Sequence, residues 1–242
     1  SDFDAVPFLT ADADGWVYTM APDAIVYGLG EMPRGINKRG WHYVANNTDE
    51  SHHGENKVSY YGAHNFLLID GGPGGDLFGV FVDFPGKVHY DIGYTVHDTL
   101  RFATEEPDYE LYILTGADPN DIAHQFRQLI GRSYIPPKWA FGLQQSRWGY
   151  KTAEDVREVT RQYKENDLPL DMICMDIDYM QDYADFTINK ERFPDLAALA
   201  AELKAQGIRL VPIIDAGVRI DPEEPTCTEG LEKGYFCKKE DG

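Results

Sequence analysis

The sequence predicts a mixed fold: a β-rich part with antiparallel strands, followed by strands and helices in alternation. Up to about residue 116, short segments rich in Val, Tyr, Phe and Ile are separated by turn residues, which is typical of antiparallel sheets. From Asp118 onward, apolar residues recur at helical spacing in segments that alternate with short apolar runs. The chain has 242 residues, 43% hydrophobic and 13% aromatic, so it is long and apolar enough for two globular domains.

Residues 1–117 are expected to form an antiparallel β-sandwich. The strand-like segments are, in order, GWVYTM, IVYGLG, KVSYYGAHNFLLID, DLFGVFVDFPGKVHYDIG and TLRFATEEPDYELYILTG. A glycine-rich stretch at residues 70–76 joins two of these segments and precedes no helix. We therefore interpret it as a turn and not as a phosphate-binding loop.

Residues 118–135 are expected to form a connecting helix and an extended linker. Asp118 can cap the helix with Pro119 in its first position, and Gly131 can end it. Ile122, Phe126 and Leu129 recur at spacings of three and four residues, so they are expected to form the apolar face of this helix.

Residues 136–242 are expected to begin a parallel sheet. Three strand-like runs, KWAFGLQQS, LDMICM and IRLVPII, are separated by two helical segments that start at Thr152 and Asp195. Near-continuous apolar strands with amphipathic helices between them imply a sheet covered on both faces. A doubly wound nucleotide-binding sheet would need a glycine-rich turn after its first strand, where the sequence instead reads QQSRWGY. We favour the alternative, the first β/α units of a (β/α)8 barrel that is incomplete in this chain.

The carboxyl ends of the strands carry the chemistry of such a barrel, and here they are polar. The first run ends in Arg147 and Trp148, the second in Asp176 and Asp178, and the third in Asp215. We therefore expect these five residues to line one mouth.

The net charge of −19 limits the partners of the chain. Binding to nucleic acid or to an anionic membrane depends on Lys and Arg, so neither partner is expected. No apolar run approaches the roughly 18 residues that span a bilayer. Acidic and aromatic side chains instead suit a neutral polar ligand such as a sugar. Three cysteines without disulfide or zinc spacing favour a reducing cytoplasm, although a cleaved secretory leader would leave no trace.

Several linked motifs resemble glycoside hydrolase family 31, the α-glucosidase family. Those of its catalytic barrel are PPKWAFGLQQSRWGY (136–150), MDIDYM (175–180), DFTINKERFPD (185–195) and RLVPIIDAG (209–217). Those of its amino-terminal sandwich are YGLGE (27–31) and NNTDE (46–50). The resemblance implies a retaining α-glucosidase that hydrolyses terminal non-reducing α-linked glucose from small oligosaccharides of the maltose or isomaltose type. It implies no cofactor.

The resemblance also implies roles for residues at the strand ends. Asp176 matches the aspartate that hydrogen-bonds hydroxyls of the non-reducing glucose, and Ile177 and Ile213 match apolar walls beside that sugar. Asp215 is expected to support the same subsite. A carboxylate suits this role because it can accept from two neighbouring hydroxyls at once.

Two further positions follow from the resemblance, and the role of Asp178 remains open. Trp148 occupies an aromatic position near the leaving sugar, where ordinary packing is the alternative. Asp49 matches the acid of the sandwich loop that reaches into the active site. Asp178 either contributes to the pocket or is a rim residue bonded to backbone or to Arg147.

The catalytic residues themselves are expected beyond Gly242. A retaining glycosidase needs two carboxylates roughly 5 Å apart on either side of the bond, whereas Asp176 and Asp178 would approach the sugar from one side. The family nucleophile lies in a WxDMNE-like stretch, which these residues lack. We therefore expect an inactive amino-terminal fragment that self-associates through the exposed edge of its incomplete barrel. A non-catalytic carbohydrate-binding or assembly module is the alternative.

No metal site is expected. His52, His53 and Glu55 could in principle bind a metal, but their spacing is wrong for a helical zinc site. We interpret the stretch as a solvated loop.

Overall fold

A computed structural model describes residues 8–239 of the chain. The backbone divides into two compact units, Ser1–Ser133 and Tyr134–Gly242. Each unit has a hydrophobic core of its own, so each is described separately.

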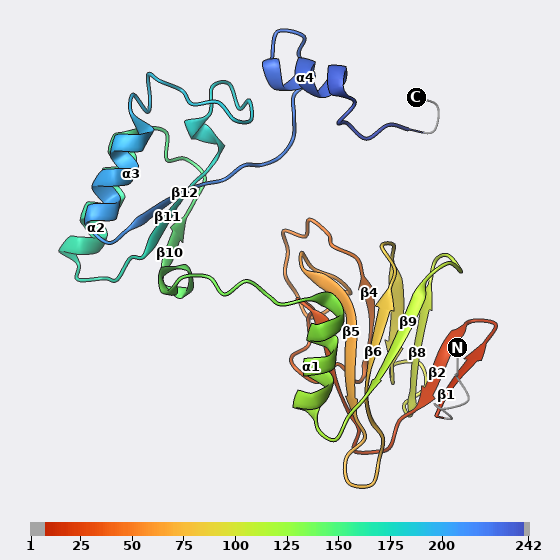
Figure 1. Cartoon of the computed structure of the whole chain (residues 1–242). Coiled ribbons are helices and arrows are strands. Elements are labelled where there is room, and N and C mark those ends of the chain that lie inside the picture. Colours follow the sequence, from red (N-terminus) through yellow and green to blue (C-terminus); the bar gives the residue numbers. More distant parts are fainter. Residues whose placement is uncertain (1–7, 240–242) are drawn as a thin grey trace. The chain divides into compact units, whose positions relative to one another are not determined.

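The first unit contains two antiparallel sheets, as the sequence predicted (Figure 1). The five-stranded sheet has the order β1 (Leu9–Asp12), β2 (Gly15–Thr19), β8 (Thr99–Thr104), β7 (Val88–Ile92) and β4 (Trp41–Ala45). The four-stranded sheet has the order β3 (Ile25–Gly30), β5 (Ala63–Asp70), β6 (Leu77–Asp83) and β9 (Glu110–Thr115).

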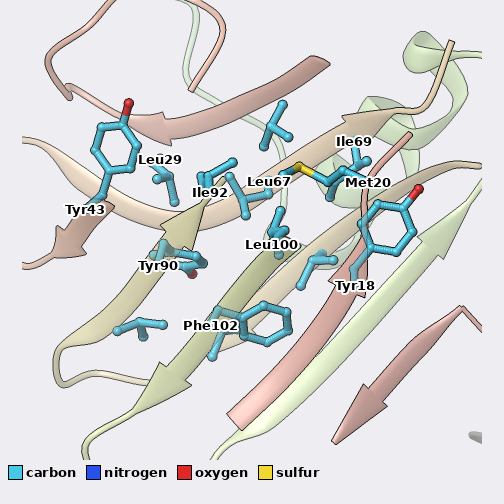
Figure 2. Packing of buried hydrophobic residues seen from close by; sticks show 14 of the residues in the cluster. Tyr18, Met20, Leu29, Tyr43, Leu67, Ile69, Tyr90, Ile92, Leu100 and Phe102 are labelled. Atoms are coloured by element: carbon cyan, nitrogen blue, oxygen red, sulfur yellow. The ribbon is translucent and has the colours of Figure 1, made fainter. Parts of the chain in front are cut away.

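The core of this unit is built from alternate residues of strands in both sheets (Figure 2). One sheet contributes Tyr90 and Ile92 of β7 and Phe102 of β8, and the other contributes Leu67 and Ile69 of β5; all five are at most 2% exposed. Side chains of this size each stabilise the fold by roughly 1.5–3 kcal/mol when fully buried. The two sheets are therefore held together by the hydrophobic effect acting on a period-two pattern.

Helix α1 (Pro119–Ile130) packs on the four-stranded sheet. Asp118 caps it by accepting hydrogen bonds from the backbone N–H groups of Asn120 and Asp121 at 2.8 and 3.0 Å. The ring of Phe126 stacks on Phe66 of β5, with centroids 4.0 Å apart. Two of the three predicted apolar positions, Ile122 and Phe126, thus face β5 and β6, whereas Leu129 is 41% exposed.

The second unit is a parallel sheet of three strands with helices between them. The elements follow in the order β10 (Gln144–Ser146), α2 (Ala153–Glu165), β11 (Met172–Met175), α3 (Leu196–Ala205) and β12 (Arg209–Pro212). This is the predicted β-α-β-α-β order. Thr152 and Asp155 form a capping box at the start of α2, and Asp195 caps α3, so both helices begin where the sequence placed them.

Two features of this unit differ from the expectation. Lys138–Phe141 forms a 3-10 helix, so the strand predicted over KWAFGLQQS is limited to Gln144–Ser146. Backbone hydrogen bonds from Ala140 to Pro137 and from Gly142 to Trp139 close the turn, and a short apolar run carries no signal that distinguishes such a turn from a strand. The sequence also gave no indication of helix α4 (Pro225–Lys233).

Within residues 8–239, the outer strands β10 and β12 each pair with a neighbour along one edge only. Self-association through the other edge stays a prediction.

Gly28 of β3 provides a test of how tightly the four-stranded sheet is packed. Its φ is +122°, and a Cβ added there would lie 2.1 Å from the carbonyl oxygen of Phe66. We expect Gly28→Ala to lower the free energy of unfolding of the first unit by about 2–4 kcal/mol, from backbone strain and overpacking together. Urea unfolding, followed through the amide NMR signals of β3, β5 and β6, measures this loss without interference from the second unit.

The matched control is Gly40→Ala. Gly40 also has positive φ, at +91°, but a Cβ there would meet nothing within 4 Å. The control carries the backbone strain without the clash, so equal losses in the two variants would contradict the packing argument.

Candidate functional site

Three strand ends meet at one edge of the parallel sheet. The register pairs Ser146 with Cys174 and Met175 with Pro212, so β10, β11 and β12 all point the same way and end together. The backbone N–H of Ile213 donates to the carbonyl of Met175 at 2.9 Å and extends the pairing by one residue. The residues expected at one mouth, from Arg147 to Asp215, therefore follow strands that end at the same edge.

Asp176 is the first residue after β11 and begins a short 3-10 helix, Ile177–Tyr179. Its Oδ1 accepts a hydrogen bond from the backbone N–H of Ile177 at 2.7 Å. The side chain is half-buried, and its second oxygen bonds to no described residue. One carboxylate oxygen thus fixes the orientation of the group, and the other is free to accept.

Asp178 differs from Asp176 in its surroundings. It is only 3% exposed, and its Oδ2 is buried without a hydrogen-bond partner among the described residues. A bond to Arg147 was one of the two alternatives for Asp178; among the described residues it is not formed, and the Nε of Arg147 donates to the carbonyl of Trp148 at 3.3 Å. Asp178 lies in the 3-10 turn, so it lacks the strand geometry that would have put Asp176 and Asp178 on one face.

Tyr179 fixes the end of the neighbouring strand, a contact that sequence reasoning missed. Its Oη donates to the carbonyl of Ile213 at 2.8 Å. Burial, and secondarily the charge of Asp185, raises the pKa of Tyr179, so the hydroxyl remains a donor at neutral pH. The bond sets the position of Ile213, which is 43% exposed at the rim.

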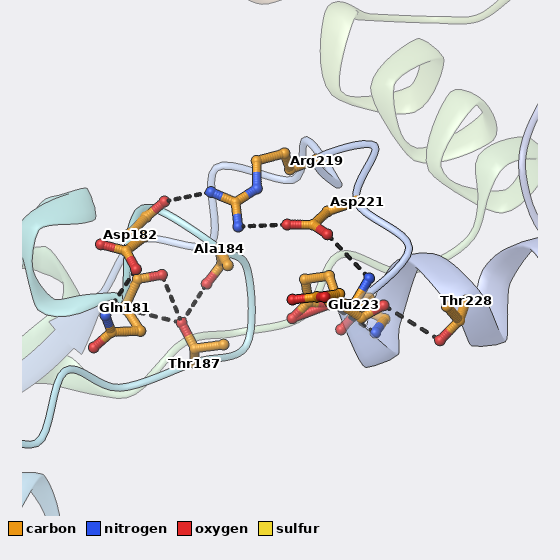
Figure 3. Close-up of polar contacts among 10 residues, drawn as sticks. Gln181, Asp182, Ala184, Thr187, Arg219, Asp221, Glu223 and Thr228 are labelled. Carbon is orange, nitrogen blue, oxygen red and sulfur yellow. Dashed lines mark hydrogen bonds and ion pairs between the residues drawn. The ribbon is translucent and has the colours of Figure 1, made fainter.

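Polar contacts link the loops that follow β11 and β12 (Figure 3). Arg219 donates to the carbonyl of Asp182 at 3.4 Å and to the carboxylate of Asp221 at 2.9 Å. The buried carboxylate of Asp185 accepts from the backbone N–H of Gly217 at 2.9 Å. These contacts join two loops that are more than 30 residues apart in sequence.

The same loops hold several residues in left-handed backbone conformations. These are Asp182, Tyr183 and Phe186 after β11, and Asp215 after β12, with φ between 50° and 65°. Such residues cost free energy and persist where surrounding contacts determine the backbone, which is common at functional sites. Thr187 supplies two of these contacts, because its hydroxyl accepts from the N–H of Gln181 at 2.9 Å and donates to the carbonyl of Ala184 at 2.6 Å (Figure 3).

The remaining rim residues face solvent. Trp148 is 68% exposed, and the side chains of Arg147 and Asp215 are also exposed. The described residues therefore present an open aromatic face and carboxylates with free acceptor oxygens at one edge of the sheet.

Asp49 lies in the first unit, on a loop between β4 and β5. The loop is closed by backbone hydrogen bonds from Val44 to Val58 and from Thr48 to Tyr60. The hydroxyl of Tyr61 donates to Asp49 Oδ1 at 2.9 Å, and this bond raises the pKa of Tyr61. The carboxylate is exposed and oriented by one contact.

The structure also bears on metals and membranes. Within residues 8–239, no group of three or more His, Cys, Asp or Glu side chains is arranged to hold a metal ion. No helix in this part of the chain is both long and apolar enough to cross a membrane.

Two family profiles match the chain, in the order of the two units. Residues 10–91 match the glycosyl hydrolase 31 N-terminal galactose mutarotase-like domain, and residues 133–242 match the glycosyl hydrolases family 31 TIM-barrel domain. Both profiles describe domains of glycoside hydrolases, which defines the class.

Individual relatives agree with the profiles. The chain is 39% identical over 218 residues to alpha-glucosidase 2 from Bacillus thermoamyloliquefaciens, and this match covers 89% of the chain and 27% of that protein. It is 32% identical to human intestinal sucrase-isomaltase, covering 88% of the chain and 12% of that protein. The cycloalternan-degrading enzyme from Trueperella pyogenes shares the fold, with a TM-score of 0.77 and 19% identity, over 93% of this chain and 35% of that one.

The chain belongs to glycoside hydrolase family 31, with the family's amino-terminal domain followed by part of its TIM-barrel domain. It spans only about a quarter of the length of alpha-glucosidase 2.

The two buried aspartates of the second unit are expected to respond oppositely to loss of charge. Asp178→Asn replaces a carboxyl group whose buried Oδ2 has no partner among the described residues with a neutral amide that costs less to bury, so the free energy of unfolding of this unit should rise by about 1 kcal/mol. Asp185→Asn weakens the hydrogen bond that the carboxylate accepts from the N–H of Gly217. This change should lower the free energy of unfolding by about 1 kcal/mol. Urea unfolding, followed through amide NMR signals of α2 and α3, measures both. Changes of the same sign would contradict the difference in their surroundings.

Proposed function

We propose that this chain is the amino-terminal portion of a retaining α-glucosidase that removes terminal non-reducing α-linked glucose from maltose- or isomaltose-type oligosaccharides. The observation that carries the proposal is the carboxylate of Asp176 at the rim of the parallel sheet, which has one oxygen free to accept a hydrogen bond. Ile177 is the next residue, and Ile213 follows strand β12 and pairs with Met175, the residue before Asp176. Two relatives named as alpha-glucosidases, from Bacillus thermoamyloliquefaciens and Saccharolobus solfataricus, support this assignment.

In this proposal, Asp176 accepts hydrogen bonds from hydroxyls of the glucose unit. Its Oδ1 is already held by the N–H of Ile177, so the carboxylate binds sugar without first losing side-chain freedom. A sugar with a displaced hydroxyl would leave the free oxygen unpaired in a closed site, and this penalty gives selectivity. Ile177 and Ile213 cover the apolar face of the ring, and Asp215 supports the same subsite.

The other proposed residues act at the edges of the sugar site. Trp148 offers an exposed flat face to the leaving sugar, at low cost in side-chain entropy. Asp49, oriented by Tyr61, is the acid that the sandwich loop contributes. Arg147 and Asp178 complete the rim, with Asp178 acting from beneath the surface because it is buried.

The cleavage step is assigned to residues outside this chain. Retention requires a nucleophilic carboxylate and an acid/base carboxylate on either side of the glycosidic bond. We propose that both belong to further β/α units of the parent enzyme, so that the 242-residue chain alone binds at most weakly and does not hydrolyse. A cytoplasmic location stays a prediction from the cysteine content.

The role of Asp176 is tested in the parent enzyme, obtained by following the reading frame of the source gene past Gly242. We expect Asp176→Asn to lower kcat/KM for maltose by about 100-fold, because an amide cannot replace a charged acceptor of two hydroxyls. Glucose release measures the effect. The control is Asp167→Asn, an exposed aspartate that precedes β11 at the opposite edge of the sheet.

Either of two outcomes would reject the proposal. Unchanged maltose hydrolysis in the Asp176→Asn variant would show that Asp176 does not bind the glucose unit. A stop codon directly after Gly242 would favour a non-catalytic carbohydrate-binding or assembly module.

Trp148 is proposed to influence linkage preference. Its indole is larger than the phenol ring of tyrosine and reshapes the space for the leaving sugar, which favours α-1,6 over α-1,4 bonds. Trp148→Tyr in the parent enzyme should therefore lower the ratio of kcat/KM for isomaltose to that for maltose, by about fivefold for a change of about 1 kcal/mol. An unchanged ratio would show that Trp148 does not set the preference.

A further inference from the structure

A pocket of about 260 Å³ opens at one end of the first unit. It is lined by residues 45–47 at the end of β4, 63–65 at the start of β5, and 84–86 in the turn after β6. Because β4 belongs to one sheet and β5 and β6 belong to the other, the pocket lies where the ends of the two sheets meet. None of the residues assigned to the glucoside site lines it.

The lining is polar but carries no acidic, lysine or arginine side chain. Its polar side chains are Asn46, Asn47, His64 and Asn65. Partial desolvation lowers the pKa of His64, so its imidazole is mainly neutral at pH 7. In a chain with a net charge of −19, an uncharged pocket of this kind disfavours ionic ligands, which would lose hydration without gaining a counter-charge.

Hydrogen bonds fix which ends of two amides are donors and acceptors. Asn47 Oδ1 accepts from the N–H of Ala63 at 2.8 Å, so its Nδ2 remains a donor without a described partner. Asn65 Nδ2 donates to the carbonyl of Phe84 at 3.1 Å, so its Oδ1 is held as an acceptor. That oxygen is buried and has no hydrogen-bond partner, which is unfavourable until a donor reaches it.

Asn46 and His64 add further hydrogen-bonding capacity. Neither side chain bonds to another described residue. Asn65 Oδ1 is shielded from solvent, so a ligand reaches it only after a neighbouring side chain turns aside. Asn46 and His64 line the same pocket, and a side chain without hydrogen bonds can move at low cost.

We propose that this pocket binds one ring of a neutral sugar, as a second carbohydrate site in the first unit, built from other residues than those assigned to the rim of the parallel sheet. A sugar hydroxyl is both donor and acceptor, so it matches the free amide donor of Asn47, the unmet acceptor of Asn65 and a neutral imidazole at the same time. The volume lies below the range of about 300–1,000 Å³ that is usual for drug-sized ligands, which fits a single pyranose ring. The inference does not depend on the proposed glucosidase activity.

Occupation of this site would also affect the loop that carries Asp49. Asn46 and Asn47 are the first residues of that loop, and the hydroxyl of Ser59, near its other end, donates to the carbonyl of Asn46. A sugar bound between Asn46, Asn47 and Asn65 would add to the bond that already joins Asn47, at the start of the loop, to Ala63 of strand β5. The second site thereby stiffens the segment that presents Asp49.

The test is an amide NMR titration of the full 242-residue chain with methyl α-glucopyranoside, and with glucose 6-phosphate as the charged probe. We expect saturable shifts at residues 45–47, 63–65 and 86 with a millimolar Kd for the neutral sugar, and much smaller shifts with the phosphate. The double variant Asn46→Ala with His64→Ala should weaken binding at least about fivefold, as two polar partners are lost.

The control removes the same residue types elsewhere in the first unit, by Asn120→Ala with His97→Ala. Both positions are exposed and lie outside the pocket, so binding should be unchanged. An unchanged urea midpoint in each variant shows that the fold is retained. In parallel, Asp176→Asn reports on the barrel rim, since it should abolish any shifts around residues 147–178 and leave the sandwich shifts intact.

The proposal is overturned if the sandwich amides show no saturable shift. It is also overturned if their shifts persist in the Asn46/His64 variant, if the phosphate binds as well as the neutral sugar, or if Asp176→Asn abolishes them. None of these results bears on hydrolysis by the parent enzyme, so failure of this inference and failure of the glucosidase proposal are distinguishable.

Discussion

The parallel pairing of β11 with strands on both sides is the constraint on which the glucoside site depends. Met172–Met175 is bonded to β10 along one edge and to β12 along the other. Ile173 and Met175 are at most 1% exposed, so the strand is fixed by apolar burial as well as by its ladder. Because all three strands run in the same direction, their polar carboxyl ends lie at the same edge of the sheet.

Beyond the strands, the rim depends on polar contacts that hold costly backbone conformations. Asp185 anchors Gly217, Tyr179 anchors the carbonyl of Ile213, and Arg219 bridges Asp182 and Asp221. Four non-glycine residues with positive φ lie in these loops. The contacts are few and specific, which is how a protein fixes rim residues on irregular loops while leaving Trp148 and Asp215 open to solvent.

The first unit is stabilised mainly by its hydrophobic core. Alternate side chains of the strands in its two antiparallel sheets point into this core, and Phe126 of α1 packs on one of the sheets. Such a core leaves the strand ends and connecting loops free for other uses. One such loop carries Asp49 with its Tyr61 bond, and the start of the same loop lines an uncharged pocket in which Asn65 has an unmet acceptor.

The sequence by itself determined the β-α-β-α-β order of the second unit, the three helix starts at Asp118, Thr152 and Asp195, and the grouping of polar residues at the ends of parallel strands. These features depend on interactions within about four residues, namely capping and periodicity, together with a general property of parallel sheets. Only the tertiary structure decided that Lys138–Phe141 is a 3-10 turn, that Asp178 is buried while Asp176 keeps a free oxygen, and that Asp185 meets Gly217. The physical reason is that burial and long-range hydrogen bonds depend on which segments meet in space, and neither leaves a pattern in the local sequence.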